Sequence, residues 1–318
     1  MFLVSWIMTH PIRLEITETE VWARQGGWGY QPDKKALRSK IRSIHYYPRR
    51  ITAGRRSRFG RYGREESPCR VCWGSHRAWV ASGETDKGKD ILTNVEIRHA
   101  GGVEGAATAK GAVVVIDVFR AFSVSAYALA GGACACRLVR EVGQARNLAD
   151  KLPGAVISAE VDGLPVDGIE ISNSPTQITQ ADLAGRVLVQ RSSAGTQAMA
   201  AAICADQRFA ASLVVAAATA RALVASGTSL VTLVASRPDH LEDVACARLL
   251  EAYLRGATPP HDLLAELLAS ERYRYLATGA HPGSPGTDYP LALATDRFDF
   301  AMPVGEDELG IAVTARYC

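Results

Sequence analysis

Residues 112–116 read Ala-Val-Val-Val-Ile and are followed at once by Asp117. A continuous run of apolar, mostly β-branched residues is typical of a strand that is covered on both faces. The next segment, residues 122–132, has the composition of a helix and ends at two glycines suited to a C-terminal cap. A buried strand followed directly by a helix is the unit from which parallel α/β sheets are built.

The same alternation continues toward the C-terminus. Further strands are predicted at residues 137–139, 156–159, 187–190, 212–215 and 230–235, and further helices at residues 142–152, 196–205, 217–225 and 241–254. Strands and helices that alternate at this spacing predict an α/β fold with a mainly parallel sheet, right-handed crossovers and helices on both faces.

Length and composition describe an ordinary globular protein. The chain has 318 residues, of which 47% are hydrophobic and 22% charged, so it can bury a sizeable core. No apolar run approaches the roughly 20 residues that cross a bilayer, and residues 1–8 lack the basic flank of a signal peptide. Seven scattered cysteines do not form the pattern of a secreted disulfide framework. We therefore expect a cytoplasmic protein with no membrane role.

Charge divides the chain into two differently composed parts. Residues 1–90 hold 18 Lys/Arg and 9 Asp/Glu, whereas residues 91–318 hold 18 and 24. All five tryptophans lie in the first part. We predict a basic, poorly ordered extension over residues 1–90 and an α/β domain over residues 91–318.

Three interpretations of the basic extension stay open. Its most basic part, residues 34–64, has few aliphatic side chains and no sustained period, which favours a disordered, solvated segment. Basic residues interleaved with Tyr46, Tyr47, Phe59 and Tyr62 are also compatible with nucleic-acid binding. The third interpretation is that the segment is not native, because translation was assigned to an upstream start codon.

A short cysteine motif also lies in this part of the chain. Cys69 and Cys72, followed by His76, have the spacing of half a zinc site. A structural zinc site needs four ligands, and no second pair follows nearby. The composition favours two incidental thiols.

Polar residues follow the predicted strands at the positions where each strand ends. They are Asp117 and Arg120 after the first strand, Glu160 after residues 156–159, Ser192, Ser193, Gly195 and Thr196 after residues 187–190, and Arg237 after residues 230–235. Open α/β sheets place ligands beyond the carboxyl ends of their strands. Carboxylates, arginines and a hydroxyl-rich turn at a helix start are the groups that bind an anion together with a divalent cation.

Each of these residues has a structural alternative. An aspartate after a strand, such as Asp117, is often a turn or cap residue, and Glu160 lies in a loop sequence where it could be solvated. The sequence has no P-loop at Gly195, no G-x-G-x-x-G after a strand and no G-x-S-x-G elbow. It is the recurrence of polar groups at successive strand ends that favours a functional site.

Four segments in order resemble the 2-phosphosulfolactate phosphatases of coenzyme M biosynthesis. They read VIDVFRA at residues 115–121, AEVDG at 159–163 leading to SNSP at 172–175, RSSAGTQ at 191–197, and LEDVACA at 241–247. The resemblance begins near Asn94 and excludes the basic extension. Ala159 and Ser172 stand where the family has glycine, and Ala194 stands where it has asparagine.

The resemblance implies a magnesium-dependent phosphomonoesterase that acts on a small anionic phosphate ester. Candidate Mg²⁺ ligands are Asp117 and Glu160, followed by Glu242 and Asp243, whose alternative role is to pair with the dipole of their own helix. The candidate catalytic residues are Asp117, Arg120, Glu160 and Ser193, and the candidate substrate-binding residues are Asn173, Ser174, Ser192, Gly195, Thr196 and Arg237. Arg120 could fork onto phosphate oxygens, and Arg237 could pair with a second anionic group.

Two other functions compete with this prediction. One is a protein that binds a small anion on the same scaffold without turnover, because the turn before Gly195 is altered. The other is a nucleic-acid-binding protein that uses the basic extension. The sequence leaves open the substrate, whether water or a side chain attacks phosphorus, and whether the chain forms a homo-oligomer.

Overall fold

The computed structural model describes residues 12–16, 21–25, 44–46 and 95–317. The chain divides into two compact units, residues 1–65 and 66–318. In the first unit, strand β1 (Ile12–Ile16) pairs antiparallel with β2 (Val21–Gln25), which pairs parallel with β3 (Ile44–Tyr46). The rest of residues 1–90, which were predicted to be poorly ordered, lies outside the described residues. The motif of Cys69, Cys72 and His76 lies there too.

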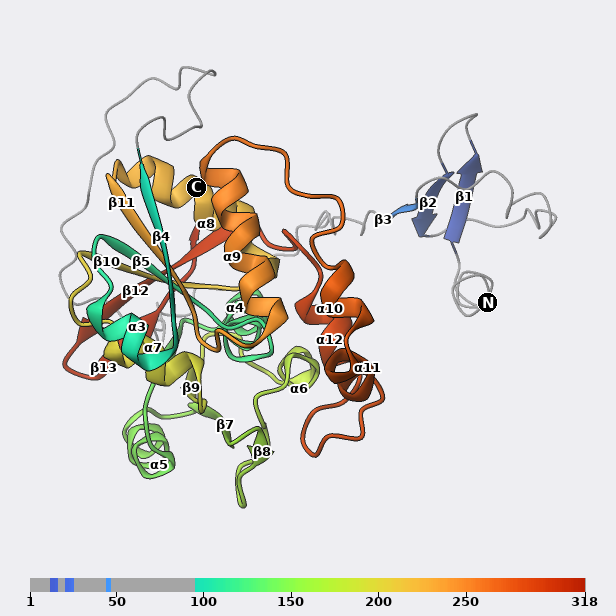
Figure 1. Ribbon diagram of the computed structural model, residues 1–318. Coiled ribbons are helices and arrows are strands. Elements are labelled where there is room, and N and C mark those ends of the chain that lie inside the picture. Colours follow the sequence, from blue (N-terminus) through green and yellow to red (C-terminus); the bar gives the residue numbers. More distant parts are fainter. Residues whose placement is uncertain (1–11, 17–20, 26–43, 47–94, 318) are drawn as a thin grey trace, which may run out of the picture. The chain divides into compact units, whose positions relative to one another are not determined.

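The second unit is built on one mixed sheet (Figure 1). Its first block of parallel strands has the order β4 (Glu96–Gly101), β11 (Leu230–Ala235), β5 (Ala112–Ile116) and β10 (Gln207–Ala211). Its second parallel block has the order β6 (Ala135–Leu138), β9 (Val187–Arg191) and β7 (Val156–Val161), and the short β8 (Leu164–Pro165) pairs antiparallel with β7. The mainly parallel sheet is thus confirmed.

An antiparallel hairpin joins the two blocks. Its strands, β12 (Phe300–Asp307) and β13 (Gly310–Val313), lie between β10 and β6, and β14 (Arg316–Tyr317) pairs with β12. Because β10–β12, β12–β13 and β13–β6 are all antiparallel, the second block runs opposite to the first.

Helix α4 (Ala121–Ala130) brings the two blocks together. Nine of its ten residues are buried, as expected of a helix that is apolar on all sides. It packs in one core cluster with Val113 and Val115 of β5 and with Cys136 and Leu188 of the second block. Two hydrogen bonds with Gln190 of β9 fix this arrangement. Ser125 Oγ donates to Gln190 Oε1 (2.6 Å), and Gln190 Nε2 donates to the Ala121 carbonyl (2.7 Å).

Helices cover both faces of the sheet, as predicted. Helices α3 (Gly102–Thr108), α6 (Pro175–Gln180) and α7 (Gly195–Ala201) lie on the side of α4, and α8 (Ala216–Ser226) and α9 (Leu241–Leu254) pack on the opposite face. Helix α5 (Val142–Lys151) packs on β7 and β9. The short helices α10 (Ala265–Ala269), α11 (Glu271–Ala277) and α12 (Asp288–Ala292) extend this unit beside α9 and α6 (Figure 1).

One predicted strand is wrong. Residues 212–215 do not form a strand, because Leu213–Val215 is a short 3₁₀ helix, η2, and the strand precedes it as β10. In β10 the buried side chain of Phe209 packs on the face that carries α8 and α9, while the backbone pairs with β5. The apolar run Leu213–Val215 is fully buried, so its composition did not distinguish a strand from a buried turn of helix.

In the part of the chain that the structure describes, no helix is both long and apolar enough to span a bilayer. The predicted boundary between residues 90 and 91 lies outside the described ranges and stays a prediction.

Candidate active site

A cavity of about 400 Å³ lies where β5, β7 and β11 end. Half of the twelve predicted site residues line it: Asp117, Arg120, Glu160, Asn173, Ser193 and Arg237. The other half, Ser174, Ser192, Gly195, Thr196, Glu242 and Asp243, do not line it. The carboxyl ends therefore meet as predicted, although the two blocks of strands run in opposite directions.

Asp117 links the two blocks at the cavity. Its Oδ1 accepts a hydrogen bond from the Ala121 N–H (3.0 Å), and its Oδ2 accepts one from the Gly195 N–H (2.8 Å). A Cβ atom at position 195 would lie 2.6 Å from Asp117 Oδ2, so this approach requires glycine. Burial raises the pKa of Asp117 to about 6, and the negative charges of Glu160 and Glu242 add to the effect.

Glu160, near the end of β7, is held by the turn that follows β9. Its Oε1 accepts from the Ser193 N–H (2.5 Å), and its Oε2 accepts from the Ser193 hydroxyl (3.1 Å) and the Gly163 N–H (2.6 Å). The Ser193 hydroxyl in turn accepts from Asp162 N (2.7 Å) and from Arg191 Nη1 (2.9 Å). Because both lone pairs of that hydroxyl are engaged, Ser193 orients Glu160 in this arrangement and presents no free lone pair for attack.

The turn between β9 and α7 uses its hydroxyl groups internally. Ser192 Oγ accepts from the Thr196 N–H (3.0 Å), and Thr196 Oγ1 accepts from the Ser192 N–H (2.9 Å). The Gly195 N–H is directed at Asp117. Ser192, Gly195 and Thr196, predicted as substrate ligands, therefore lie outside the cavity lining. Gly195 holds Asp117, and Ser192 and Thr196 stabilise the turn.

Glu242 and Asp243 lie in the first turn of α9, and both are buried. Arg272 Nη1 binds both oxygens of Glu242 (2.7 and 2.8 Å). Asp243 accepts from Val118 N (2.8 Å), Ser236 Oγ (3.0 Å) and Arg237 N (3.2 Å). Burial raises the pKa of Asp243 well above its usual range, and repulsion from Asp117 and Glu242 raises it further.

The cationic and amide groups reach the cavity from several elements. Arg120 is 7% exposed and donates from Nη1 to Asp288 Oδ2 (2.8 Å) and to the Gly283 carbonyl (2.9 Å). Asn173 precedes Ser174, which caps α6 by accepting from Gln177 N (3.2 Å). The guanidinium of Arg237 forms no ion pair with a described residue.

The C-terminal segment supplies the part of the cavity that the sequence did not predict. Arg272, Tyr275, Leu276, His281, Ser284 and Tyr289 line it, together with Phe119 and His240. Phe119 and Tyr289 pack edge to face with ring centroids 4.9 Å apart. The Arg272 guanidinium lies 6.0 Å from the centre of the Phe119 ring. One wall of the cavity is thus aromatic and partly cationic.

The donor set limits how a metal ion could bind. No group of three or more His, Cys, Asp or Glu side chains among the described residues is arranged to hold a metal ion. Three carboxylates line the cavity, of which Asp117 and Glu160 are buried and Asp162 is exposed. Both Asp117 oxygens and Glu160 Oε1 accept one described hydrogen bond each. Each keeps a lone pair. Two carboxylates fit Mg²⁺, which usually takes one or two and completes its shell with water and phosphate oxygens.

These features define a class of protein: an α/β protein whose cavity carries buried carboxylates and a buried arginine. Residues 100–275, more than half of the chain, match the family model described as 2-phosphosulpholactate phosphatase. The chain therefore belongs to this family.

Three relatives, each named a probable 2-phosphosulfolactate phosphatase, show the extent of the similarity. The protein from Bacillus subtilis is 32% identical over 145 residues, which cover 45% of this chain and 64% of the relative. Those from Carboxydothermus hydrogenoformans and Thermus thermophilus are 36% and 37% identical, over 30% and 28% of this chain and 39% and 37% of the relatives. The chain thus spans less than two thirds of the length of these relatives.

Proposed function

We propose that this protein is a magnesium-dependent phosphomonoesterase. Its substrate is a small anionic phosphate ester, 2-phosphosulfolactate or a similar phosphorylated hydroxy acid, which is hydrolysed to the alcohol and phosphate. The observation that carries the proposal is the convergence of Asp117, Glu160 and Arg120 on one cavity. Family membership and the names of the relatives support the substrate class.

Asp117 and Glu160 are the residues that would hold Mg²⁺. A bound Mg²⁺ would neutralise negative charge on the phosphoryl group and on the leaving oxygen. Burial and the negative charges of Glu160 and Glu242 raise the pKa of Asp117, so a divalent cation bound there would stabilise its charged form. Ser193 and Gly195 hold the two carboxylates in place through their N–H groups.

Arg120 is proposed to bind the phosphoryl oxygens. Both of its described hydrogen bonds leave from Nη1, so no described hydrogen bond engages Nε or Nη2, and the residue lines the cavity. Charge-assisted, forked hydrogen bonds suit the planar guanidinium. Asn173 adds an amide on the same lining, and Arg237, which also lines the cavity, is proposed to pair with a second anionic group of the substrate.

Phosphate release from a panel of phosphorylated hydroxy acids, with Mg²⁺ and with EDTA, tests the proposal. We expect release of phosphate from at least one small anionic ester, only with Mg²⁺, and its loss in Asp117→Asn. Binding of the esters without any release would favour the alternative, a small-anion binding protein on the same scaffold. A cytoplasmic location, expected from the cysteine pattern, is part of the same proposal.

A further inference from the structure

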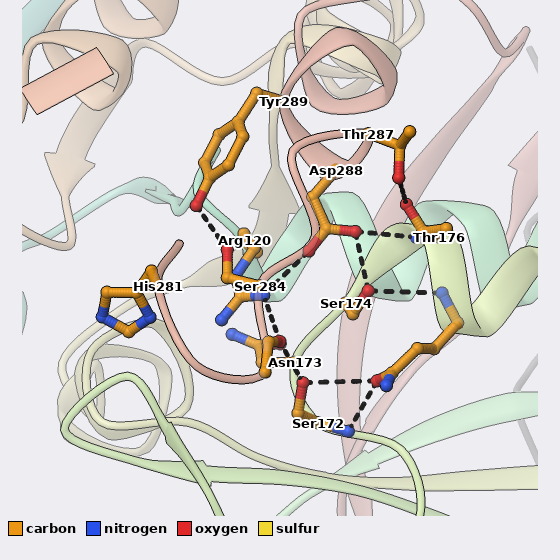
Figure 2. A network of polar contacts seen from close by, with 12 residues as sticks. Arg120, Ser172, Asn173, Ser174, Thr176, His281, Ser284, Thr287, Asp288 and Tyr289 are labelled. Carbon is orange, nitrogen blue, oxygen red and sulfur yellow. Dashed lines mark hydrogen bonds and ion pairs between the residues drawn. The ribbon is translucent and has the colours of Figure 1, made fainter. Parts of the chain in front are cut away.

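Asp288 lies at the start of α12, outside the residues that match the family model. It does not line the cavity itself, but its side chain contacts Arg120, which does. Figure 2 shows it between Arg120 on one side and Ser174 and Thr176 on the other. Its Oδ2 accepts from Arg120 Nη1 (2.8 Å), and its Oδ1 accepts from Ser174 Oγ (2.6 Å) and Thr176 N (3.0 Å). Asp288 itself is fully buried.

The loop before α12 reinforces this contact. The Gly283 carbonyl accepts from Arg120 Nη1 (2.9 Å) and from the Ser172 hydroxyl. Gly283 has a φ of +65°, and a Cβ atom there would lie 2.4 Å from Pro165 Cγ, so the close approach requires glycine. Asp288 and Gly283 both bind Nη1 of Arg120, and no described hydrogen bond engages the other two nitrogens of this cavity-lining residue.

A buried guanidinium needs this kind of partner for two reasons. An uncompensated buried charge is costly, and Asp288 supplies the opposite charge at hydrogen-bond distance. A forked contact to phosphate also depends on the plane of the guanidinium, which an unrestrained arginine side chain would not keep. The same carboxylate binds Ser174, so it fixes the residue next to cavity-lining Asn173.

We propose that Asp288 is a positioning residue of this site. Its carboxylate holds the Arg120 guanidinium, and through Ser174 it holds Asn173, in the orientation that receives the phosphate group of the substrate. The inference rests on the proposed function for its activity readout, but binding of inorganic phosphate tests it without turnover.

The test measures kcat, KM and the affinity for inorganic phosphate, the latter by calorimetry, in Asp288→Asn. We expect phosphate affinity to fall by about tenfold or more and kcat/KM by at least as much, because Arg120 loses its fixed orientation. The matched control is Thr287→Ala, which removes the exposed hydrogen bond between Thr287 Oγ1 and Thr176 Oγ1 (2.9 Å) that joins the same two segments. The control should stay within about twofold of the wild type.

A double-mutant cycle separates positioning from general stability. In an Arg120→Ala background, Asp288→Asn should lower kcat/KM by a clearly smaller factor than in the wild-type background, because only its effect through Ser174 remains. An equal loss in both backgrounds, or no loss in the wild-type background, would overturn the proposal. If Asp288→Asn does not fold, Ser174→Ala takes its place, and it should lower phosphate affinity while the protein still unfolds cooperatively; an unchanged affinity would overturn the proposal.

The outcomes also separate this inference from the proposed function. A wild-type protein that binds phosphate but hydrolyses no ester would refute the proposed phosphatase activity. The same double-mutant cycle, measured on phosphate affinity, would still decide the role of Asp288. A wild-type protein that neither binds phosphate nor hydrolyses an ester would overturn both.

Discussion

Two pairs of buried carboxylates lie close together in this protein and differ in what they face. Asp117 and Glu160 line the cavity and accept hydrogen bonds mainly from backbone N–H groups. Glu242 and Asp243 lie outside the lining, where Arg272 neutralises the first and three donors surround the second. Burial alone therefore does not define a catalytic carboxylate. The difference is whether oxygen lone pairs remain available to a ligand in the cavity.

The largest effect is expected when a cavity-lining carboxylate loses its charge. We expect Asp117→Asn and Glu160→Gln each to lower kcat/KM by at least about 100-fold, through lost metal positioning and charge stabilisation. Steady-state kinetics measure the effect, and Asp150→Asn, an exposed carboxylate of α5, is the matched control. Near-wild-type kinetics in either variant would remove that residue from the site.

The second prediction concerns Arg120, the buried arginine that lines the same cavity. Arg120→Ala should weaken transition-state stabilisation by about 2–4 kcal/mol, the effect of losing a charge-assisted donor. Arg120→Lys should restore only part of kcat/KM, because an ammonium cannot reproduce the planar fork. A fully active lysine variant would show that charge without geometry suffices at this position.

The third prediction uses the pKa of Asp117, which burial raises to about 6 in the folded protein. A carboxyl group with a raised pKa binds its proton more tightly in the folded state, so its contribution to stability is present below the unfolded value near 4 and is lost as pH rises through 6. Without metal, the free energy of unfolding should fall by about 2–3 kcal/mol between pH 4 and pH 7 relative to Asp117→Asn.

Denaturant unfolding of both proteins across that pH range, in the presence of EDTA, gives this difference. A difference that does not change with pH would show that Asp117 is not destabilised in its charged form.

The fourth prediction sharpens the contrast from the other side. Asp243→Asn keeps one acceptor oxygen but leaves at least one of its donors, the buried Val118 N and Ser236 Oγ and the part-buried Arg237 N, without a partner. We expect the free energy of unfolding to fall by about 1–3 kcal/mol. Asp239→Asn, an exposed neighbour, is the control for denaturant unfolding. Unchanged stability together with complete loss of turnover would instead place Asp243 in the chemistry.

These contrasts explain which parts of the site were predictable. Asp117, Arg120 and Glu160 are read from the sequence because each lies in or just after a strand whose end is fixed by the fold. The sequence does not show where a side chain in the first turn of a helix points, so Glu242 and Asp243 were grouped with the lining carboxylates. Arg272, His281 and Tyr289 were missed because the short helices around them carry no extended period.

The fold shows the same limit. Local sequence patterns predicted β5, α4 and α9 closely, because the buried residues of each element lie in one uninterrupted stretch of sequence. The hairpin β12–β13 inserts between β10 and β6 from the C-terminal end of the chain, and no local pattern indicates such a pairing. Asp288 likewise binds Arg120 across 168 residues of sequence.

The smallest effect is expected from the basic N-terminal segment. Removal of residues 1–90 should leave turnover within about twofold and unfolding cooperative, because few core contacts should cross that boundary. Thermal unfolding and phosphate release compare proteins that begin at Met1 and near Ile91. Aggregation or inactivity of the shorter protein would show that the segment packs against the α/β unit.

Reversible metal dependence of phosphate release tests whether the cavity around Asp117 and Glu160 is a magnesium-dependent active site. The wild-type protein is chelated exhaustively, assayed with its best phosphorylated hydroxy acid, and assayed again after Mg²⁺ is added back, beside Asp117→Asn. We expect no release after chelation, recovery with Mg²⁺ in the wild type, and no recovery in the variant. Full turnover by the exhaustively chelated wild-type protein would contradict it.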